Sequence, residues 1–319
     1  MYLLHGEETY LREYYLAEMK KRLLPPGTET FNFHTLEGKD ADVRALTEAV
    51  DCLPMMAERT LVLVTDYDLF KAPADQRDGL AELFGQLPDY CCLIFYYDLL
   101  TYKPDSRTKL AAAIKQHGQT VELSRQEQTD LVPWICRRFR ASGKDIQTED
   151  AKYLIFLCGD LMTGLISEIE KIAFYSQGKT VTRGEIDAVA IPQLDAVVFQ
   201  MTDAIAAGNY DKAAAVLGDL LRMQESPIMI LSVLGKQMRQ LYSARLSLEH
   251  KKGAKYLASL WKMHPYPAEK LMSAAHRFEL RWCIRAVTRC AETDLAMKST
   301  GLDGESLLIG LLMELASPC

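Results

Sequence analysis

The sequence predicts an α/β domain followed by two all-helical domains. Over residues 1–125, short apolar runs alternate with amphipathic stretches, a pattern typical of a mainly parallel sheet with helices on both faces. From residue 126 onward, the apolar stretches have the spacing of helices. A proline at position 192 marks a further boundary, so we expect domains at residues 1–125, 126–192 and 193–319.

Length and composition exclude several classes of protein. The 319 residues fit two or three domains, and a hydrophobic content of 49% is enough for a core. The formal net charge of −6 gives no global basic field that would attract nucleic acid. The eight cysteines lack CxxC or Cys/His spacing suited to zinc, so we expect no metal and a reducing, cytoplasmic location. A strand begins at Tyr2 and no apolar run reaches the ~18–20 residues of a membrane span, so we expect neither signal peptide nor membrane partner.

Strands and helices alternate through the first domain. Apolar or alternating runs predict strands at Tyr2–Leu4, Thr30–Leu36, Leu61–Val64, Tyr90–Tyr97 and Gln119–Leu123. Apolar residues three and four positions apart predict helices at Thr9–Leu24, Asp42–Leu53, Gln76–Leu87 and Ser106–His117. Gly118 ends the last of these helices.

The two later domains are expected to contain helices only. A helix at Thr129–Arg140 leads into a three-helix module at Thr148–Cys158, Gly159–Ala173 and Thr182–Val189. Thr182 and Glu185 have the spacing of a capping box. Beyond Pro192 we expect a helical bundle, with helices at Val197–Ala207, Tyr210–Met223, Pro227–Leu248, Lys255–Met263, Pro267–Phe278, Leu280–Thr300 and Ser306–Leu315.

Leu53, Pro54, Met55 and Met56 form an apolar segment between a predicted helix and a predicted strand. Pro54 ends the helix because it lacks an amide donor and restricts the residue before it. Two interpretations are open. The methionines cap the core at the end of the strand, or they stay exposed as a flexible apolar docking surface.

The turn after the first strand lacks the features of a phosphate-binding loop. It reads His5 to Tyr10, which is too short, and it contains no lysine to meet phosphate charge. Glu7 and Glu8 lie where a helix N-terminus would otherwise attract an anion. We interpret Asp66 and Asp68 as loop acids rather than magnesium ligands, and the Gly-Lys-Thr sequence at 178–180 as a turn. The first domain is therefore predicted to have a nucleotide-binding type of fold without a nucleotide site or cofactor.

A basic run follows the first helix of the second half. It comprises Arg137, Arg138, Arg140 and Lys144. These cations could contact phosphate groups. They also fit a solvated helix end whose positive charges complement the helix dipole.

Segments distributed along the whole chain resemble one known family. They are Tyr2–Leu11, Leu53–Val62, Gly159–Lys171, Pro227–Arg239 and Asp294–Gly301. Together they resemble the delta-subunit family of the bacterial DNA polymerase III clamp loader. The first segment resembles the family's opening strand, Gly-Glu-Glu turn and first helix, and the second resembles the segment before its third strand. The last three resemble its helical-module signature, the start of its long collar helix and its penultimate element. The resemblance implies an AAA+-like domain without a nucleotide site, a lid-type three-helix domain and a helical collar that mediates oligomerisation.

The resemblance also implies a function. Members of this family do not bind ATP, grip the ring-shaped beta sliding clamp and open one ring interface. The contact is made by apolar side chains in the segment that Leu53, Met55 and Met56 occupy here. The family often has aromatic residues at these positions, and methionine also packs well into apolar pockets.

The implied partners are the clamp, the ATPase and delta-prime subunits through the collar, and primed DNA only within the complex. The chain would have no catalytic site of its own, although it would belong to a DNA polymerase holoenzyme with nucleotidyltransferase activity. Three alternatives are open: an ATP-hydrolysing loader subunit, a scaffold subunit of the delta-prime type, and a helical interaction protein outside replication. The short turn argues against the first, the missing cysteine cluster against the second, and the alternating first half against the third.

Overall fold

A computed structural model describes residues 1–316, which form two compact units. The first unit contains Met1–Gln126 together with Leu161–Thr163. The second contains Glu127–Asp160 and the chain from Gly164 onward. The mixed α/β and all-helical fold class predicted from the sequence is confirmed, whereas the further boundary at residue 192 stays a prediction.

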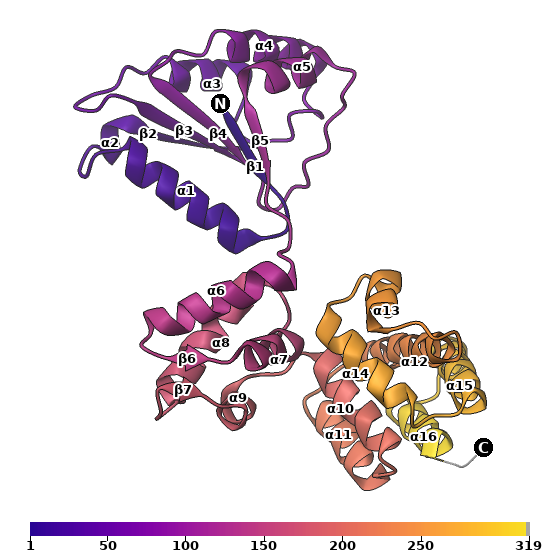
Figure 1. Ribbon diagram of the computed structural model, residues 1–319. Coiled ribbons are helices and arrows are strands. Elements are labelled where there is room, and N and C mark those ends of the chain that lie inside the picture. Colours follow the sequence, from indigo (N-terminus) through magenta and orange to yellow (C-terminus); the bar gives the residue numbers. More distant parts are fainter. Residues whose placement is uncertain (317–319) are drawn as a thin grey trace. The chain divides into compact units, whose positions relative to one another are not determined.

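The first unit is built on a five-stranded parallel sheet with the order β2-β3-β4-β1-β5 (Figure 1). Its strands are β1 (Tyr2–His5), β2 (Phe33–Glu37), β3 (Thr60–Thr65), β4 (Cys91–Tyr96) and β5 (Gln119–Glu122). Strand β4 is buried along its whole length, and the neighbouring β3 is buried from Thr60 to Val64, as expected for strands covered on both faces. In the register, Leu61 pairs with Cys92 and Val64 with Phe95.

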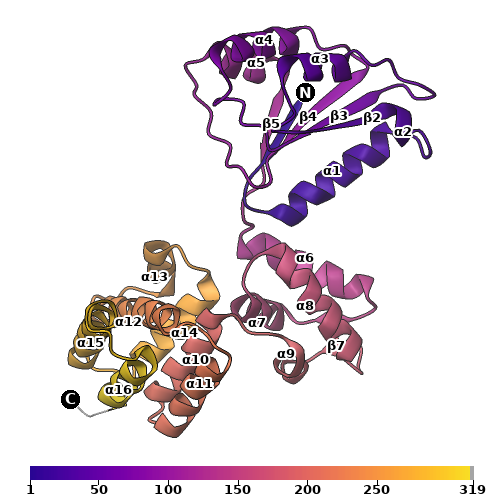
Figure 2. The same ribbon diagram turned by 180° about the vertical axis from the view of Figure 1, so that it is seen from behind.

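Helices cover both faces of the sheet, as both views of the unit show (Figures 1 and 2). Helix α1 (Thr9–Leu23) covers one face, where Leu61 and Ile94 lie in a buried cluster. Helices α3, α4 and α5 cover the other face, where Val62 and Phe95 are buried. These helices span Val43–Val50, Ala74–Gly85 and Lys109–His117. The alternation of side chains along β3 and β4 thus supplies two separate cores.

Several boundaries in this unit differ from the sequence prediction by two or three residues, and two of these differences affect the loop before β3. Residues Glu29–Asn32 form a short helix, α2, and the strand predicted from Thr30 begins only at Phe33. Helix α3 ends at Val50, three residues before the predicted end. Backbone hydrogen bonds from the N–H groups of Phe31 and Asn32 to the carbonyl of Thr28 hold the α2 turn.

The second unit is helical, apart from one short pair of strands. Strands β6 (Asp145–Ile146) and β7 (Thr180–Val181) pair in parallel, which the sequence analysis did not predict. The predicted capping box is confirmed, because Thr182 and Glu185 exchange side-chain and backbone hydrogen bonds at the start of α9. The first helices of the unit are α6 (Gln128–Ala141), α7 (Thr148–Cys158), α8 (Met162–Tyr175) and α9 (Arg183–Val189).

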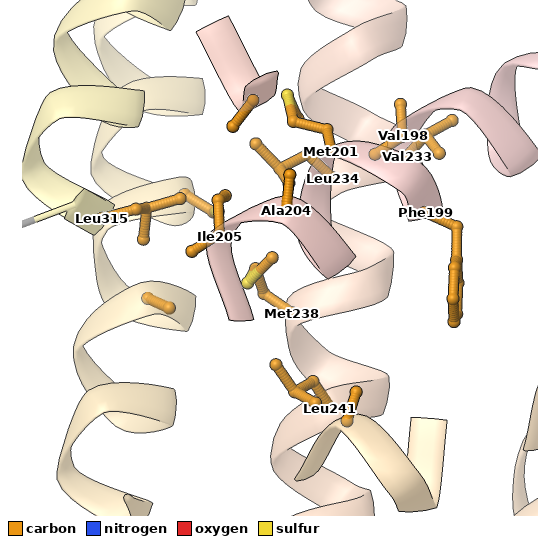
Figure 3. Close-up of a cluster of buried hydrophobic side chains, with 14 of the residues drawn as sticks. Val198, Phe199, Met201, Ala204, Ile205, Val233, Leu234, Met238, Leu241 and Leu315 are labelled. Atoms are coloured by element: carbon orange, nitrogen blue, oxygen red, sulfur yellow. The ribbon is translucent and has the colours of Figure 1, made fainter. Parts of the chain in front are cut away.

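The remaining helices pack around α12 (Pro227–Glu249), which contacts α10, α14 and α15. Figure 3 shows Met201 and Ile205 of α10 beside Leu234 and Met238 of α12, with Leu315 of α16 completing the cluster. The other bounds are α10 (Leu194–Ala206), α11 (Tyr210–Arg222), α13 (Ala254–Trp261), α14 (Pro265–Ala275), α15 (Leu280–Ser299) and α16 (Gly304–Ala316). This apolar core explains the Leu-, Met- and Ala-rich composition of the C-terminal half.

The module before residue 192 packs on this bundle through aromatic rings. The ring centroid of Phe156 in α7 lies 5.1 Å from that of Phe199 in α10 and 5.6 Å from that of Tyr266 in α14. Such edge-on and tilted contacts add to the burial of apolar area. Among residues 1–316, no helix is long and apolar enough to cross a membrane.

Candidate functional site

The segment Leu53–Met56, here called the knuckle, lies in the loop between α3 and β3 and exposes most of its apolar surface. The exposed fractions are 71% for Leu53, 56% for Met55 and 88% for Met56. Three large apolar side chains therefore face solvent within four residues. They do not cap the core, because the buried residues begin at Thr60.

Asn32 of α2 holds the backbone of the knuckle. Its side-chain amide donates a hydrogen bond to the Met55 carbonyl at 2.8 Å, and its side-chain oxygen accepts one from the Met55 N–H at 2.8 Å. Asn32 is fully buried, and its amide also donates to the carbonyl of Thr28 at 3.0 Å. Helix α3 ends at Val50, before the knuckle begins, so the hydrogen bonds that fix Met55 come from the separate element α2.

The backbone at Met56 adopts the left-handed conformation, with φ of +57°. Residues other than glycine, asparagine and aspartate rarely adopt it, because Cβ approaches the neighbouring carbonyl oxygen. This conformation changes the chain direction at the most exposed methionine. An exposed apolar side chain in an uncommon backbone conformation marks the knuckle as a functional candidate.

The turn between β1 and α1 is closed by the segment that follows β5. Gly6 has a φ of +124°, and a Cβ atom there would lie 2.3 Å from the carbonyl oxygen of Leu123. The N–H of Glu8 donates to the same oxygen at 2.9 Å, and the Glu8 side chain is buried. In a phosphate-binding loop, backbone N–H groups at this position point at the ligand. Here the N–H of Glu8 already donates to a carbonyl of the protein.

The two acids after β3 have structural partners. The Asp66 carboxylate accepts hydrogen bonds from the backbone N–H groups of Asp98, Leu99 and Leu100 at 2.8–3.0 Å. Asp68 forms an ion pair with Lys71 at 2.9 Å. Among the residues that the structure describes, no group of three or more His, Cys, Asp or Glu side chains could hold a metal ion.

Three of the four cations in the basic run of the second unit interact with other groups of the protein. Lys144 donates to the carbonyls of Ser176 and Gly178, at 2.6 and 2.8 Å. Arg140 lies 3.7 Å from Asp145. The predicted phosphate contact of Arg137, Arg138, Arg140 and Lys144 stays a prediction.

Arg138 lies over the ring of Trp134, with its guanidinium carbon 5.5 Å from the ring centroid. This contact restricts the guanidinium to one side of α6. Arg137 is exposed on the same helix. The four cations therefore have different surroundings, although they are neighbours in sequence.

The apolar residues of the knuckle are conspicuous in the sequence, where exposure was one of two interpretations, whereas the role of Asn32 is not visible there. A lone asparagine between Thr30 and Phe33 gives no periodic signal, and its partner Met55 is 23 residues away. The one local signal is the preference of asparagine for bonding nearby backbone groups, which favours turns over strands.

Two family profiles match separate parts of the chain. The profile of the family described as DNA polymerase III, delta subunit, matches residues 2–124, and that of the DNA polymerase III delta subunit, C-terminal domain, matches residues 195–315. The chain is 24% identical over 324 aligned residues to the DNA polymerase III subunit delta of Bacillus subtilis, covering 99% of this chain and 92% of that protein. It is also 24% identical over 254 residues to the probable DNA polymerase III subunit delta of Aquifex aeolicus, covering 77% and 70%.

A solved structure has a similar fold. The Bacillus subtilis DNA clamp loader delta protein (YqeN) aligns with a TM-score of 0.58 at 22% identity, covering 99% of this chain and 94% of that one. This similarity concerns the fold, and the two family profiles together with the full-length relative carry the assignment. The chain belongs to the family of DNA polymerase III delta subunits, which are components of the clamp loader.

Proposed function

We propose that this chain binds the beta sliding clamp through the knuckle and opens the ring so that it can be loaded on primed DNA. The observation that carries the proposal is the exposure of Leu53, Met55 and Met56 on a loop that Asn32 ties to the sheet unit. The resemblance places the clamp contact of the family in this segment. Flexible thioether side chains suit an apolar pocket on a protein partner.

Differential binding would provide the mechanism. A subunit opens a ring only if it binds the opened edge more tightly than the closed one. Burial of a large apolar side chain contributes about 1.5–3 kcal/mol. Two or three such side chains would shift an interface equilibrium by a few kcal/mol, which is enough to favour an opened state that is rare in the free clamp.

We infer that the chain does this without binding ATP. The β1–α1 turn has no lysine, and the buried Glu8 would disfavour a triphosphate. The Glu8 N–H, which a phosphate loop would leave for its ligand, already donates to the Leu123 carbonyl. The chain would have no catalytic site of its own and would act in the polymerase holoenzyme through its partners.

The helical bundle would join the subunit to the ATPase and delta-prime subunits of the loader in the cytoplasm. Large apolar side chains are exposed on its helices and their connections, and would be covered by neighbouring subunits. They include Met223, Ile228, Met229, Ile284, Leu295, Leu302, Ile309 and Met313. Primed DNA would be met only within the assembled complex.

The double substitution Met55→Ala/Met56→Ala tests the proposal. We expect clamp binding to weaken by at least a hundredfold, because each of the two side chains would contribute about 1.5–3 kcal/mol when it becomes buried against the clamp. The fold and the assembly with loader subunits should be unchanged, since both side chains are exposed. Size-exclusion chromatography and calorimetric titration with the cognate clamp, with and without ATP, measure the effect.

Met223→Ala is the matched control, because Met223 is 76% exposed but lies in the helical unit. It should bind the clamp like the wild type. Co-elution of the double variant with the clamp at wild-type affinity would reject the knuckle as the contact. Saturable ATP binding by the isolated wild-type chain would reject the ATP-independent mechanism.

A further inference from the structure

The side chain of Asn32 joins two segments that are distant in sequence. It is fully buried, although asparagine usually lies at the surface. Both ends of its amide bond the backbone of Met55, each at 2.8 Å, so that the side chain satisfies the N–H and the carbonyl of one residue. A third bond, to the carbonyl of Thr28, fixes the amide to α2.

Leu53 and Met56, which lie near Met55 on either side, are mainly exposed to solvent. Leu53 and Met56 are 71% and 88% exposed, and Met56 has left-handed backbone geometry. A loop of exposed apolar residues gains little from its own packing and would sample many conformations without a fixed point. Asn32 provides that point in the middle of the knuckle.

Resting on the clamp-binding function proposed above, we infer that Asn32 is a positioning residue that sets the knuckle in its docking conformation before the clamp arrives. It contacts no clamp atom in this role and acts only through the Met55 backbone. Binding by a flexible loop is weakened by the fraction of time that the loop spends in the competent shape. Fixing the backbone beforehand removes that loss.

The substitution Asn32→Ala removes the hydrogen bonds and leaves Leu53, Met55 and Met56 in place. Clamp binding should weaken about tenfold or more, as expected if the competent conformation falls to about one-tenth of the population. Amide hydrogen exchange should accelerate at Met55, while the amides of β3 and β4 keep their protection.

Binding rates separate positioning from a direct contact. Because only the competent fraction of the chain can bind, Asn32→Ala should lower the association rate constant about tenfold and leave the dissociation rate constant nearly unchanged. Met56→Ala should cost the same binding free energy on the Asn32→Ala background as on the wild-type background, because Met56 makes the same contact once the competent conformation is reached. The matched control is Asp66→Ala. It removes backbone hydrogen bonds from the same unit at the opposite end of β3, and should leave both clamp affinity and the cost of Met56→Ala unchanged.

The outcomes are distinguishable. If the wild-type chain does not bind the clamp, the proposed function itself fails. If the wild type binds and Asn32→Ala binds equally well, or if its effect is no larger than that of Asp66→Ala, the positioning role is rejected. A dissociation rate constant that rises as much as the affinity falls would also reject it, because Asn32 would then act in the complex and not before binding.

Discussion

Single polar side chains fix two loops of the sheet unit. Asn32 holds the loop before β3, and Asp66 holds the loop after β4. In each case one side chain bonds the backbone of a segment more than twenty residues away. Such bonds satisfy backbone groups that would otherwise lack partners, and they therefore determine the path of a loop more strongly than exposed ion pairs do.

Asp66→Ala should lower the free energy of unfolding of the sheet unit by about 1.5–3 kcal/mol, because three backbone N–H groups lose a charged acceptor. Urea unfolding followed by circular dichroism measures the change. Asp68→Ala is the control, since it removes an ion pair with an exposed lysine and only one backbone hydrogen bond, from the Lys71 N–H at 3.3 Å, and should change the free energy by no more than about 1 kcal/mol. Equal effects of the two variants would contradict the structural role of Asp66.

At the residue scale, the sequence predicted which side chains to examine but not what holds them. Leu53, Met55 and Met56 stood out because they form an apolar segment around Pro54, between a predicted helix and a predicted strand. Their exposure depends on where the chain turns after α3. The spacing of apolar residues in the sequence does not determine that turn, and it was equally compatible with buried methionines. The Asn32 contact is non-local and leaves no periodic signal in the sequence.

At the scale of elements, strong periodicity gave reliable predictions and short elements did not. The helices of the C-terminal half and the central strands β3 and β4 appear where they were expected, within a few residues. Helix α2 was predicted as part of a strand, because Phe31 and Phe33 alternate with polar residues. The two-residue strands β6 and β7 depend on pairing across about 35 residues of chain, which local pattern does not encode.

The capping box of α9 provides a test at this scale. Thr182→Ala should destabilise the helix by about 1 kcal/mol, because the N–H of Glu185 loses its side-chain acceptor. The loss of stability would appear as faster amide hydrogen exchange in the variant, confined to Arg183–Val189. Ser226→Ala at the start of α12 is the control, since Ser226 makes no side-chain cap hydrogen bond and its loss should leave exchange in α12 unchanged.

The same capping box makes the stability of α9 depend on pH. The backbone N–H and hydroxyl of Thr182 donate to the Glu185 carboxylate and hold its pKa below the usual value of 4.5. The folded state therefore favours the charged form, so the stabilisation is present above the usual pKa and is lost as the pH falls through the lowered one. Glu185→Gln should remove this acid dependence of exchange in α9, and an unchanged profile would contradict the assignment.

At the scale of the molecule, the alternation of strands and helices followed by helices alone was sufficient to predict the architecture. The parallel order of the sheet follows from that alternation, since parallel strands need crossover helices. The sequence did not show that the contacts divide the chain into two compact units. That division depends on the packing of α7 against α10 and α14, which involves residues more than forty positions apart.

This division predicts which unit carries the proposed clamp binding. A fragment of residues 1–126 contains the sheet, both of its cores and the knuckle. It should unfold cooperatively and bind the clamp with the affinity of the full chain, whereas residues 127–319 should not bind. Calorimetric titration of both fragments measures this, and a folded first fragment without affinity for the clamp would place essential contacts in the helical unit.

The exposed methionines also make the proposed grip vulnerable to oxidants. Met55 and Met56 leave 56% and 88% of their surface open to solvent, so peroxide can reach their sulfur atoms. Conversion to the sulfoxide would place a polar S=O group on each side chain, and an apolar pocket would then accept them poorly. A leucine or phenylalanine in the same place would not change in this way. Clamp loading by this subunit would accordingly weaken under oxidative stress and recover when sulfoxide reductases restore the thioethers.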